Sequence, residues 1–196
     1  MSKANLLERR SVVSALLAER RQAIVVGGLG ASTYDIAAAG DHDRNFYLWG
    51  AMGGAVMIGL GVALAQPKLP VVVITGDGEM LMGMGSLATV GLQKPENLTI
   101  IVLDNEVYGE TGGQASHTAA TTDLVGVARA CGISDVRTLS TMAEIEAFAP
   151  SMQDVSRGPR FVSIKIDSAN LERVLASRDG SFIVTRIRGA LGFGPI

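Results

Sequence analysis

The run Val71-Val72-Val73-Ile74-Thr75 is β-branched throughout and apolar in four of its five positions. Such residues favour strands, and a strand with no polar alternation is buried on both faces. Residues 23–26, 99–103 and 161–166 form similar runs. Because strands of this kind occur in parallel sheets that are covered by helices, the sequence predicts such a sheet.

Segments with helical spacing or helix-length apolar stretches separate these strands. Helices are expected at residues 3–21, 33–39, 53–65, 83–92, 123–131 and 142–152, with a further strand at residues 46–48. The alternation predicts an α/β fold with a doubly wound, mostly parallel sheet and helices on both faces. We expect a single domain over residues 1–196, and no clear pattern follows residue 167.

Composition excludes several classes of protein. The chain has 17 basic and 19 acidic residues, so its net charge of −2 does not favour binding to nucleic acids or anionic membranes. The single cysteine, Cys131, excludes an internal disulfide and a four-cysteine metal site and is expected to pack beside a helix. The longest apolar run, residues 51–65, is shorter than the roughly 20 residues of a membrane span. Residues 1–10 do not resemble a signal peptide, so we expect a cytoplasmic protein.

Glycine is unusually abundant, with 24 of 196 residues. Clusters occur at residues 27–30, 50–61, 76–78 and 109–113, mostly next to apolar runs. Ligands of doubly wound sheets bind beyond the carboxyl ends of the strands, where three of these loops are expected to meet. The clusters therefore predict an anion site, although tight packing of strands on helices produces the same pattern.

Two polar residues follow neighbouring strands of the predicted sheet. Asp77 lies between Gly76 and Gly78 after one strand, and Asn105 comes two positions after Leu103 at the end of the next. If the strands pair, both side chains emerge at one edge of the sheet, where carboxylate and amide oxygens suit Mg²⁺ or Ca²⁺. The alternative is a tight turn at Asp77 and a loop cap at Asn105.

The Gly-Asp-Gly sequence, followed by Asn105 after 26 intervening residues, resembles the thiamine diphosphate-binding motif. The likeness extends over residues 24–166. It implies that thiamine diphosphate is the cofactor and that Mg²⁺ is held by Asp77, Asn105 and the main-chain carbonyl of Val107. It also implies the fold of the diphosphate-binding, C-terminal-type domain.

The same resemblance implies further cofactor contacts. Met52 occupies the position of the apolar side chain that supports the bent cofactor, although it could simply fill the core. Glu79 departs from the small residue usual in decarboxylases of this family, and it is also expected to begin a helix. The expected cofactor-binding residues are Gly28, Gly30, Ser32, Gly50, Met52, Gly76, Gly78, Glu79, Tyr108 and Gly109.

In this family a second domain supplies the carboxylate that activates the cofactor, and 196 residues leave no room for it. The resemblance therefore implies a subunit that is inactive until it joins a pyrimidine-domain partner, as an α2β2 heterotetramer, or until it forms a homo-oligomer. Residues 45–53 resemble the sulfopyruvate and phosphonopyruvate decarboxylase branch, which implies decarboxylation of a small acidic 2-oxo acid. The loop at residues 110–118 is expected to contact the substrate, with His117 as the catalytic proton donor or a solvated surface group.

Three alternatives remain open at this point. The chain could be the β subunit of an enzyme like the 2-oxoacid:ferredoxin oxidoreductases, with clusters on a partner, or part of an enzyme like acetolactate synthase. It could also be a thiamine diphosphate-binding accessory chain without turnover, because the metal-binding residues would serve either role.

Overall fold

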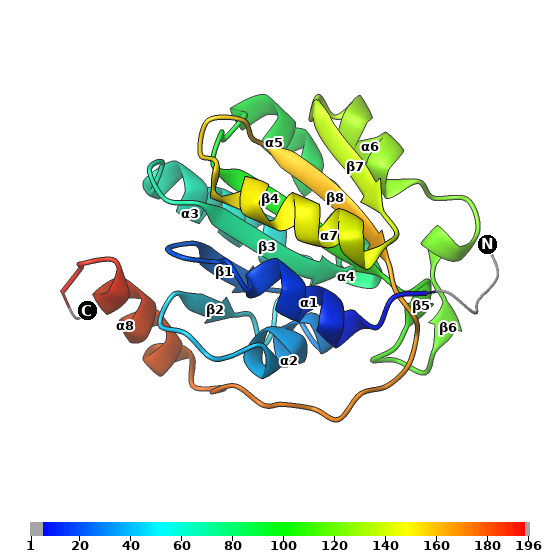
Figure 1. Cartoon of the computed structure of the whole chain (residues 1–196), viewed down its shortest axis with the longest axis horizontal. Coiled ribbons are helices and arrows are strands. Elements are labelled where there is room, and N and C mark those ends of the chain that lie inside the picture. Colours follow the sequence, from blue (N-terminus) through cyan, green and yellow to red (C-terminus); the bar gives the residue numbers. More distant parts are fainter. Residues whose placement is uncertain (1–5, 195–196) are drawn as a thin grey trace.

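The computed structural model describes residues 6–194 and contains a six-stranded sheet whose paired strands all run parallel (Figure 1). The strand order is β2-β1-β3-β4-β8-β7. The strands are β1 (Ile24–Gly27), β2 (Asn45–Tyr47), β3 (Val71–Gly76), β4 (Leu98–Asp104), β7 (Asp135–Leu139) and β8 (Arg160–Lys165). The order reverses direction after β1 and confirms the predicted doubly wound sheet.

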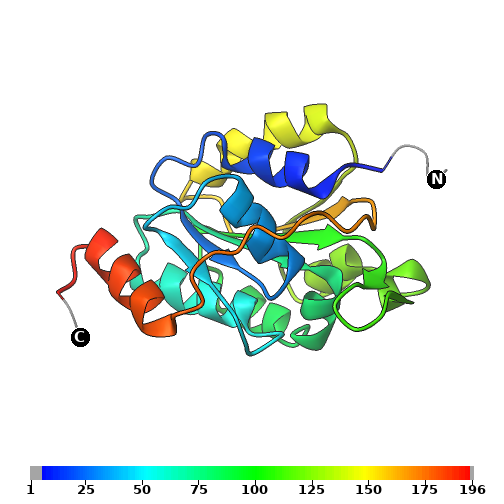
Figure 2. The same ribbon diagram turned by 90° about the horizontal axis from the view of Figure 1, so that it is seen from below.

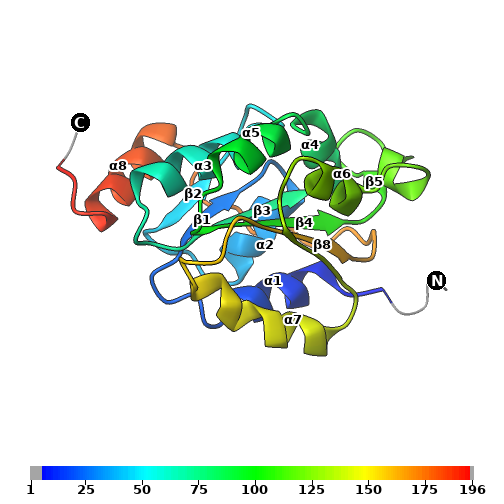
Figure 3. The same cartoon turned by 90° about the horizontal axis from the view of Figure 1, so that it is seen from above.

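Helices cover both faces of this sheet (Figure 3). One face packs against α1 (Arg9–Leu17), α2 (Ala31–Ala38) and α7 (Met142–Phe148), which continues into the 3₁₀ turn Ala149–Gln153. The other face packs against α3 (Ala55–Ala65), α4 (Asp77–Met82), α5 (Ser86–Gln93) and α6 (Leu124–Ala130). The described part of the chain has no helix long and apolar enough to cross a membrane.

The pairing of β3 with β4 positions the polar residues that follow them. Gly76 is opposite Leu103 in this register, so Asp77 and Asp104 leave the sheet at the same edge. Both strands are buried along their length because neither carries alternating polar residues. The predicted neighbourhood of these two strand ends is therefore confirmed.

The helix predicted at residues 83–92 is wrong at its start. The chain enters α4 directly at Asp77, breaks at Gly83 and begins α5 at Ser86. A Cβ added to Gly83 would lie 2.1 Å from the carbonyl oxygen of Gly53, so the break lets two backbone segments approach closely.

The helix predicted at residues 3–21 is shorter than expected. It begins at Arg9 because the carboxylate of Glu8 accepts hydrogen bonds from the backbone N–H groups of Arg10 and Ser11. Leu7, before the cap, forms a parallel bridge with Ile166. Residues 3–5 of the predicted helix lie outside the described residues.

Several elements were not predicted from the sequence. Strand β7 lies at the edge of the sheet, and the loop after β4 contains the short hairpin of β5 (Val107–Tyr108) and β6 (Gln114–Ala115), followed by the 3₁₀ turn His117–Ala119. Helix α8 (Gly180–Ala190) packs beside β2, where Arg186 bonds to Asp41 at 2.6 Å.

Residues 167–179 connect β8 to α8 without regular structure, and we call them the C-terminal strap. Figure 2 shows the strap passing over α2 from one side of the molecule to the other. The backbone N–H of Asp167 bonds to the carbonyl of Leu7 at 2.9 Å, and the indole of Trp49 donates to the carbonyl of Ser177 at 2.6 Å. These bonds hold the strap to the body of the protein at both ends.

Candidate cofactor site

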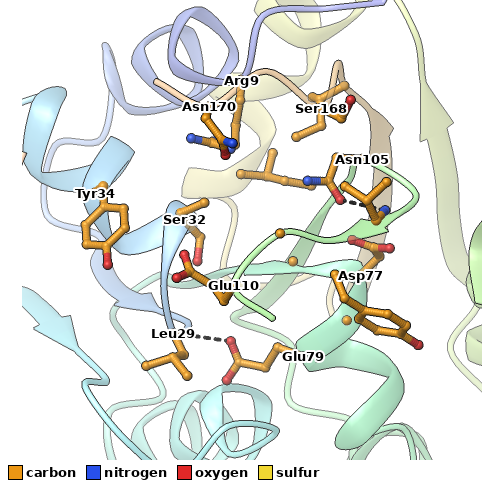
Figure 4. A pocket seen from close by; sticks show the side chains of 18 of the residues that line it. Arg9, Leu29, Ser32, Tyr34, Asp77, Glu79, Asn105, Glu110, Ser168 and Asn170 are labelled. Carbon is orange, nitrogen blue, oxygen red and sulfur yellow. Dashed lines mark hydrogen bonds between the residues drawn. The ribbon is translucent and has the colours of Figure 1, made fainter. Parts of the chain in front are cut away.

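A cavity of about 400 Å³ lies at the carboxyl ends of β3 and β4 (Figure 4). Its wall combines the start of α4, the loop after β1, the β5 hairpin and the C-terminal strap. The predicted site residues that line it are Ser32, Met52, Gly76, Asp77, Gly78, Glu79, Asn105, Val107, Tyr108 and Gly109. A cavity at this edge of a doubly wound sheet is the expected position of a ligand.

Asp77 is only 2% exposed, although no basic side chain bonds to it among the described residues. The Ser116 and Thr118 hydroxyls donate to its Oδ2, the latter at 3.1 Å. Burial raises the pKa of Asp77 and the charge of Asp104 raises it further, while the two hydroxyl bonds act in the opposite direction. A buried carboxylate that is bound only by hydroxyls is suited to a bound cation.

The loop from Asp104 to Val107 is held in a tight conformation. The Asn105 carboxamide oxygen accepts the Val107 N–H at 3.1 Å, and the Asp104 carboxylate accepts the Glu106 N–H at 3.2 Å. Glu106 has a φ of +63°, which is uncommon for a residue with a side chain. The loop therefore depends on these side-chain bonds to keep its shape.

Lys165 at the end of β8 connects this loop to the sheet. Its ammonium donates to Asp104 at 2.8 Å and to Glu106 at 2.6 Å. Burial opposes the charge on Lys165, but these two hydrogen bonds outweigh it and raise the pKa of the ammonium. Lys165 also compensates the charge of Asp104, which is 3% exposed.

The side chain of Glu79 is buried, and no basic side chain of the described residues bonds to its carboxylate. It lies in the first turn of α4, as predicted, and is 4% exposed. Its carboxylate accepts the Leu29 N–H at 2.8 Å, the Thr75 hydroxyl at 2.8 Å and the Gly53 N–H at 3.2 Å. Glu79 therefore joins three separate segments of the cavity wall.

Gly78 allows two larger side chains to approach the start of α4. A Cβ at this position would lie 2.9 Å from the Tyr108 ring and 3.8 Å from the end of Met52. Met52 is 37% exposed and lines the cavity, so it does not simply fill the core. Its predicted role beneath the cofactor stays a prediction.

Four predicted site residues do not line the cavity: Gly28, Gly30, Gly50 and His117. A Cβ on Gly28 would lie 2.0 Å from a carboxylate oxygen of Glu79, so this glycine makes room for that side chain. Gly30 has a φ of +79° and precedes α2, while Gly50 is exposed with open space around it. His117 is exposed on the 3₁₀ turn, where its Nδ1 lies 2.5 Å from the hydroxyl of Tyr108.

Ser32 does line the cavity, but its hydroxyl already donates to the carbonyl of Gly28 at 3.1 Å. The neighbouring Thr33 hydroxyl donates to the same oxygen at 2.6 Å. These bonds turn the chain from β1 into α2 and fix the loop that lines the cavity.

Several cavity residues carried no recognisable signal in the sequence. Arg9 comes from α1, and Ser168, Asn170, Leu171 and Arg173 come from the C-terminal strap. The guanidinium of Arg173 lies 3.7 Å from the carboxylate of Glu110 and 5.5 Å from the centre of the Tyr34 ring. No clear pattern follows residue 167 in the sequence, so nothing there distinguished Arg173 as a residue of the cavity wall.

Comparison with known proteins gives relatives along most of the chain. The chain is 43% identical over 166 residues to a phosphonopyruvate decarboxylase of Streptomyces viridochromogenes, covering 84% of this chain and 41% of that protein. It is 33% identical over 189 residues to the sulfopyruvate decarboxylase subunit beta of Methanothermobacter thermautotrophicus, covering 94% of this chain and 98% of that subunit.

The fold also occurs in a solved structure from Mycobacterium smegmatis that is assigned to the thiamin diphosphate-dependent enzymes. The two share a TM-score of 0.68 and 19% identity over 86% of this chain and 32% of the other. Residues 26–166 match the family described as "Thiamine pyrophosphate enzyme, C-terminal TPP binding domain". The chain belongs to the thiamine pyrophosphate enzyme family and contains its C-terminal, cofactor-binding domain.

Proposed function

We propose that the chain is the diphosphate- and Mg²⁺-binding subunit of a thiamine diphosphate-dependent decarboxylase that acts on a small acidic 2-oxo acid. The observation that carries the proposal is the meeting of Asp77 with the Asn105–Val107 loop at one cavity. The names of the two decarboxylase relatives support a substrate such as sulfopyruvate or phosphonopyruvate. Cytoplasmic location stays a prediction from the sequence.

Asp77, Asn105 and the Val107 carbonyl fit a magnesium ion. The three groups offer oxygen ligands only, all three residues line the cavity, and the buried Asp77 lacks a cationic partner among the described residues. Magnesium commonly completes its coordination with substrate phosphates and water. We propose that the ion bridges these residues to the diphosphate.

When bound, the cofactor would supply the electron sink that stabilises the carbanion left by decarboxylation. The chain's own residues would bind and orient it. Met52 would support it from the side of α4, and Glu79 would hold the surrounding loops together through its three hydrogen bonds. His117 stays a candidate proton donor that acts from outside the present cavity wall.

A partner subunit is part of this proposal. Of the three carboxylates that line the cavity within residues 6–194, Asp77 is at the proposed metal position, Glu79 is held by three donors, and Glu110 is 42% exposed and lies 3.7 Å from Arg173. The activating carboxylate would therefore come from a pyrimidine-domain chain, as an α2β2 heterotetramer, or from another copy in a homo-oligomer. The near-complete coverage of a β subunit favours the heterotetramer.

Calorimetry of the full chain with thiamine diphosphate tests the binding half of the proposal. We expect binding that requires Mg²⁺ and is lost in Asp77→Asn, because the change removes the one negatively charged group among the three proposed ligands. Glu146→Gln, an exposed change on α7, is the control and should bind like the unmodified chain. No binding by the unmodified chain, alone or with its partner, would contradict the proposal.

Release of CO₂ from sulfopyruvate, phosphonopyruvate and pyruvate tests the catalytic half. Turnover should require co-expression with a pyrimidine-domain partner. Normal turnover by the chain alone would refute the need for a partner. Cofactor binding without turnover in the complex would instead favour an accessory chain.

A further inference from the structure

Arg9 is a buried cation in the wall of the cavity. The residue is 7% exposed, it is the first residue of α1, and it lines the cavity although the metal-binding loops are far from it in the sequence. Figure 4 shows Arg9 beside Asn170, at the end of the cavity opposite Glu79. Burial of an arginine is costly unless its charge is compensated.

Asp35 of α2 compensates only part of this charge. Its carboxylate is fully buried and accepts the Nε–H groups of both Arg9 and Arg10, the latter at 3.1 Å. Arg9 therefore shares its one carboxylate partner with Arg10, and Arg10 also lies close enough to the Glu8 carboxylate to lower the pKa of that group. Arg10 directs a terminal nitrogen to the carbonyl of Glu172 at 2.6 Å and does not line the cavity.

The terminal nitrogens of Arg9 have no hydrogen-bond partner within residues 6–194. A guanidinium whose Nε is fixed by a carboxylate presents its two remaining nitrogens as a fork, the geometry that binds a phosphoryl group through two bonds. The side chains of Ser168 and Asn170 in the C-terminal strap lie at the same end of the cavity, and neither makes a hydrogen bond to another described residue (Figure 4).

The acidic groups of the cavity do not oppose an anion at this end. Asp77 is at the proposed metal position, and Glu79 is fully engaged at the opposite end. The third acid that lines the cavity, Glu110, lies 3.7 Å from the guanidinium of Arg173, which also lines the cavity. The end of the cavity at Arg9 therefore presents a guanidinium whose terminal nitrogens can bind an anion, while the end at Asp77 would need a bound cation.

We propose that Arg9, positioned by Asp35 and assisted by the Asn170 carboxamide, binds the terminal phosphoryl group of the cofactor. The inference rests on the proposed function, since it assumes that the diphosphate occupies this cavity. Magnesium would neutralise the diphosphate from the side of Asp77 and Asn105, and Arg9 would do so from α1. A sulfonate or phosphonate of the substrate has similar chemistry and is the competing occupant.

The test is calorimetry of the full chain in the presence of Mg²⁺ with thiamine diphosphate and thiamine monophosphate as separate ligands. Arg9→Gln should weaken thiamine diphosphate binding about 10- to 100-fold, the usual consequence of losing a charge-assisted bond. The same change should alter thiamine monophosphate binding less than about threefold, because that ligand lacks the terminal phosphoryl group. Arg10→Gln is the matched control, since it removes the other partner of Asp35 without touching the cavity, and it should retain normal binding of both ligands.

Several outcomes would overturn the inference. These are unchanged diphosphate binding in Arg9→Gln, equal losses for the two thiamine phosphates, or equal losses in Arg9→Gln and Arg10→Gln, which would indicate a structural role only. A raised KM for sulfopyruvate in the complex, with cofactor affinity unchanged, would assign Arg9 to the substrate instead. If Arg9→Gln does not fold, Arg9→Lys is the second variant, because it keeps a cation for Asp35 but loses the paired terminal nitrogens. It should also weaken the binding of thiamine diphosphate more than the binding of thiamine monophosphate.

Failure of this inference is distinguishable from failure of the proposed function. If the unmodified chain binds thiamine diphosphate with Mg²⁺ and Arg9→Gln binds it equally well, only the role of Arg9 is lost. If the unmodified chain takes up no cofactor in either its isolated or its partner-bound form, the proposed function is lost and this inference with it.

Discussion

Replacing Glu79 with glutamine should destabilise the protein, although the two side chains have the same number of non-hydrogen atoms. Glu79 is buried and accepts three hydrogen bonds, two on one carboxylate oxygen from Leu29 and Thr75 and one on the other from Gly53. A glutamine has one oxygen and one NH₂ group. If its oxygen serves Leu29 and Thr75, its NH₂ group faces the N–H of Gly53, so one donor loses its acceptor.

The magnitude follows from these three bonds. Loss of one hydrogen bond to a charged acceptor costs about 1.5–3 kcal/mol. The two remaining bonds change from charged to neutral acceptors, which are roughly half as strong and cost about 1 kcal/mol more. We therefore expect the free energy of unfolding to fall by about 2.5–4 kcal/mol.

Urea denaturation followed by circular dichroism measures this change. With a slope of about 2–3 kcal/mol per molar urea, the midpoint should fall by about 1 M. Glu110→Gln is the control, because Glu110 lines the same cavity but is 42% exposed and paired only at 3.7 Å, so its midpoint should barely move. A midpoint for Glu79→Gln within error of the unmodified protein would refute the view that Glu79 joins the three segments.

Three further changes test other contacts. Gly83→Ala should cost about 2–4 kcal/mol in thermal or urea unfolding, because its Cβ would lie 2.1 Å from a backbone oxygen; Gly85→Ala, with open space, should be neutral, and equal effects would contradict the argument. Burial opposes the ionisation of Asp41, but hydrogen bonds from Arg186 and Tyr47 outweigh burial and lower the pKa of Asp41 below its usual value of 3.8. Ionised Asp41 therefore stabilises the folded protein above pH 3.8, and this stabilisation is lost as the pH falls through the lower pKa of the folded state. Asp41→Asn should therefore flatten the urea midpoint's dependence on pH below about 4, and an unchanged profile would exclude this pairing. Lys165→Met should weaken Mg²⁺-dependent cofactor binding about tenfold in calorimetry, because the change removes the two hydrogen bonds that hold the Asp104–Val107 loop. Unchanged affinity would show that this loop keeps its shape without Lys165.

The sheet could be predicted from the sequence because its central strands are buried on both faces. Strands β1, β3 and β4 are mainly apolar runs, β8 is buried along most of its length although it contains Arg160, Ser163 and Lys165, and all four lie in the middle of the sheet. Strand β7 was missed because it lies at the edge, where Asp135 and Arg137 remain partly exposed. Its sequence therefore lacks the apolar run on which the prediction depended.

Short and distant elements escaped the same reasoning. Helix α4 has only six residues, too few for a helical period to be recognised, and its start coincides with the glycine-rich turn. Helix α8 follows the C-terminal strap, and it packs through Ile183 and Ile187, with Arg186 bonded to Asp41 from a loop far away in the sequence. No local pattern could identify those contacts.

Some residues of the candidate site could likewise be predicted from the sequence, and others could not. Asp77 and Asn105 could be brought together from the sequence because each directly follows a strand, and adjacent parallel strands end at the same edge. Arg9 could not, because its direction depends on Asp35, which lies 26 residues away on another helix and is buried by packing rather than by any motif. A strand end fixes the position of the next side chain through the backbone, whereas the buried arginine depends on which carboxylate the packing of α1 on α2 provides. The metal position is thus encoded locally, while the cationic end of the cavity exists only once both helices have packed on the sheet.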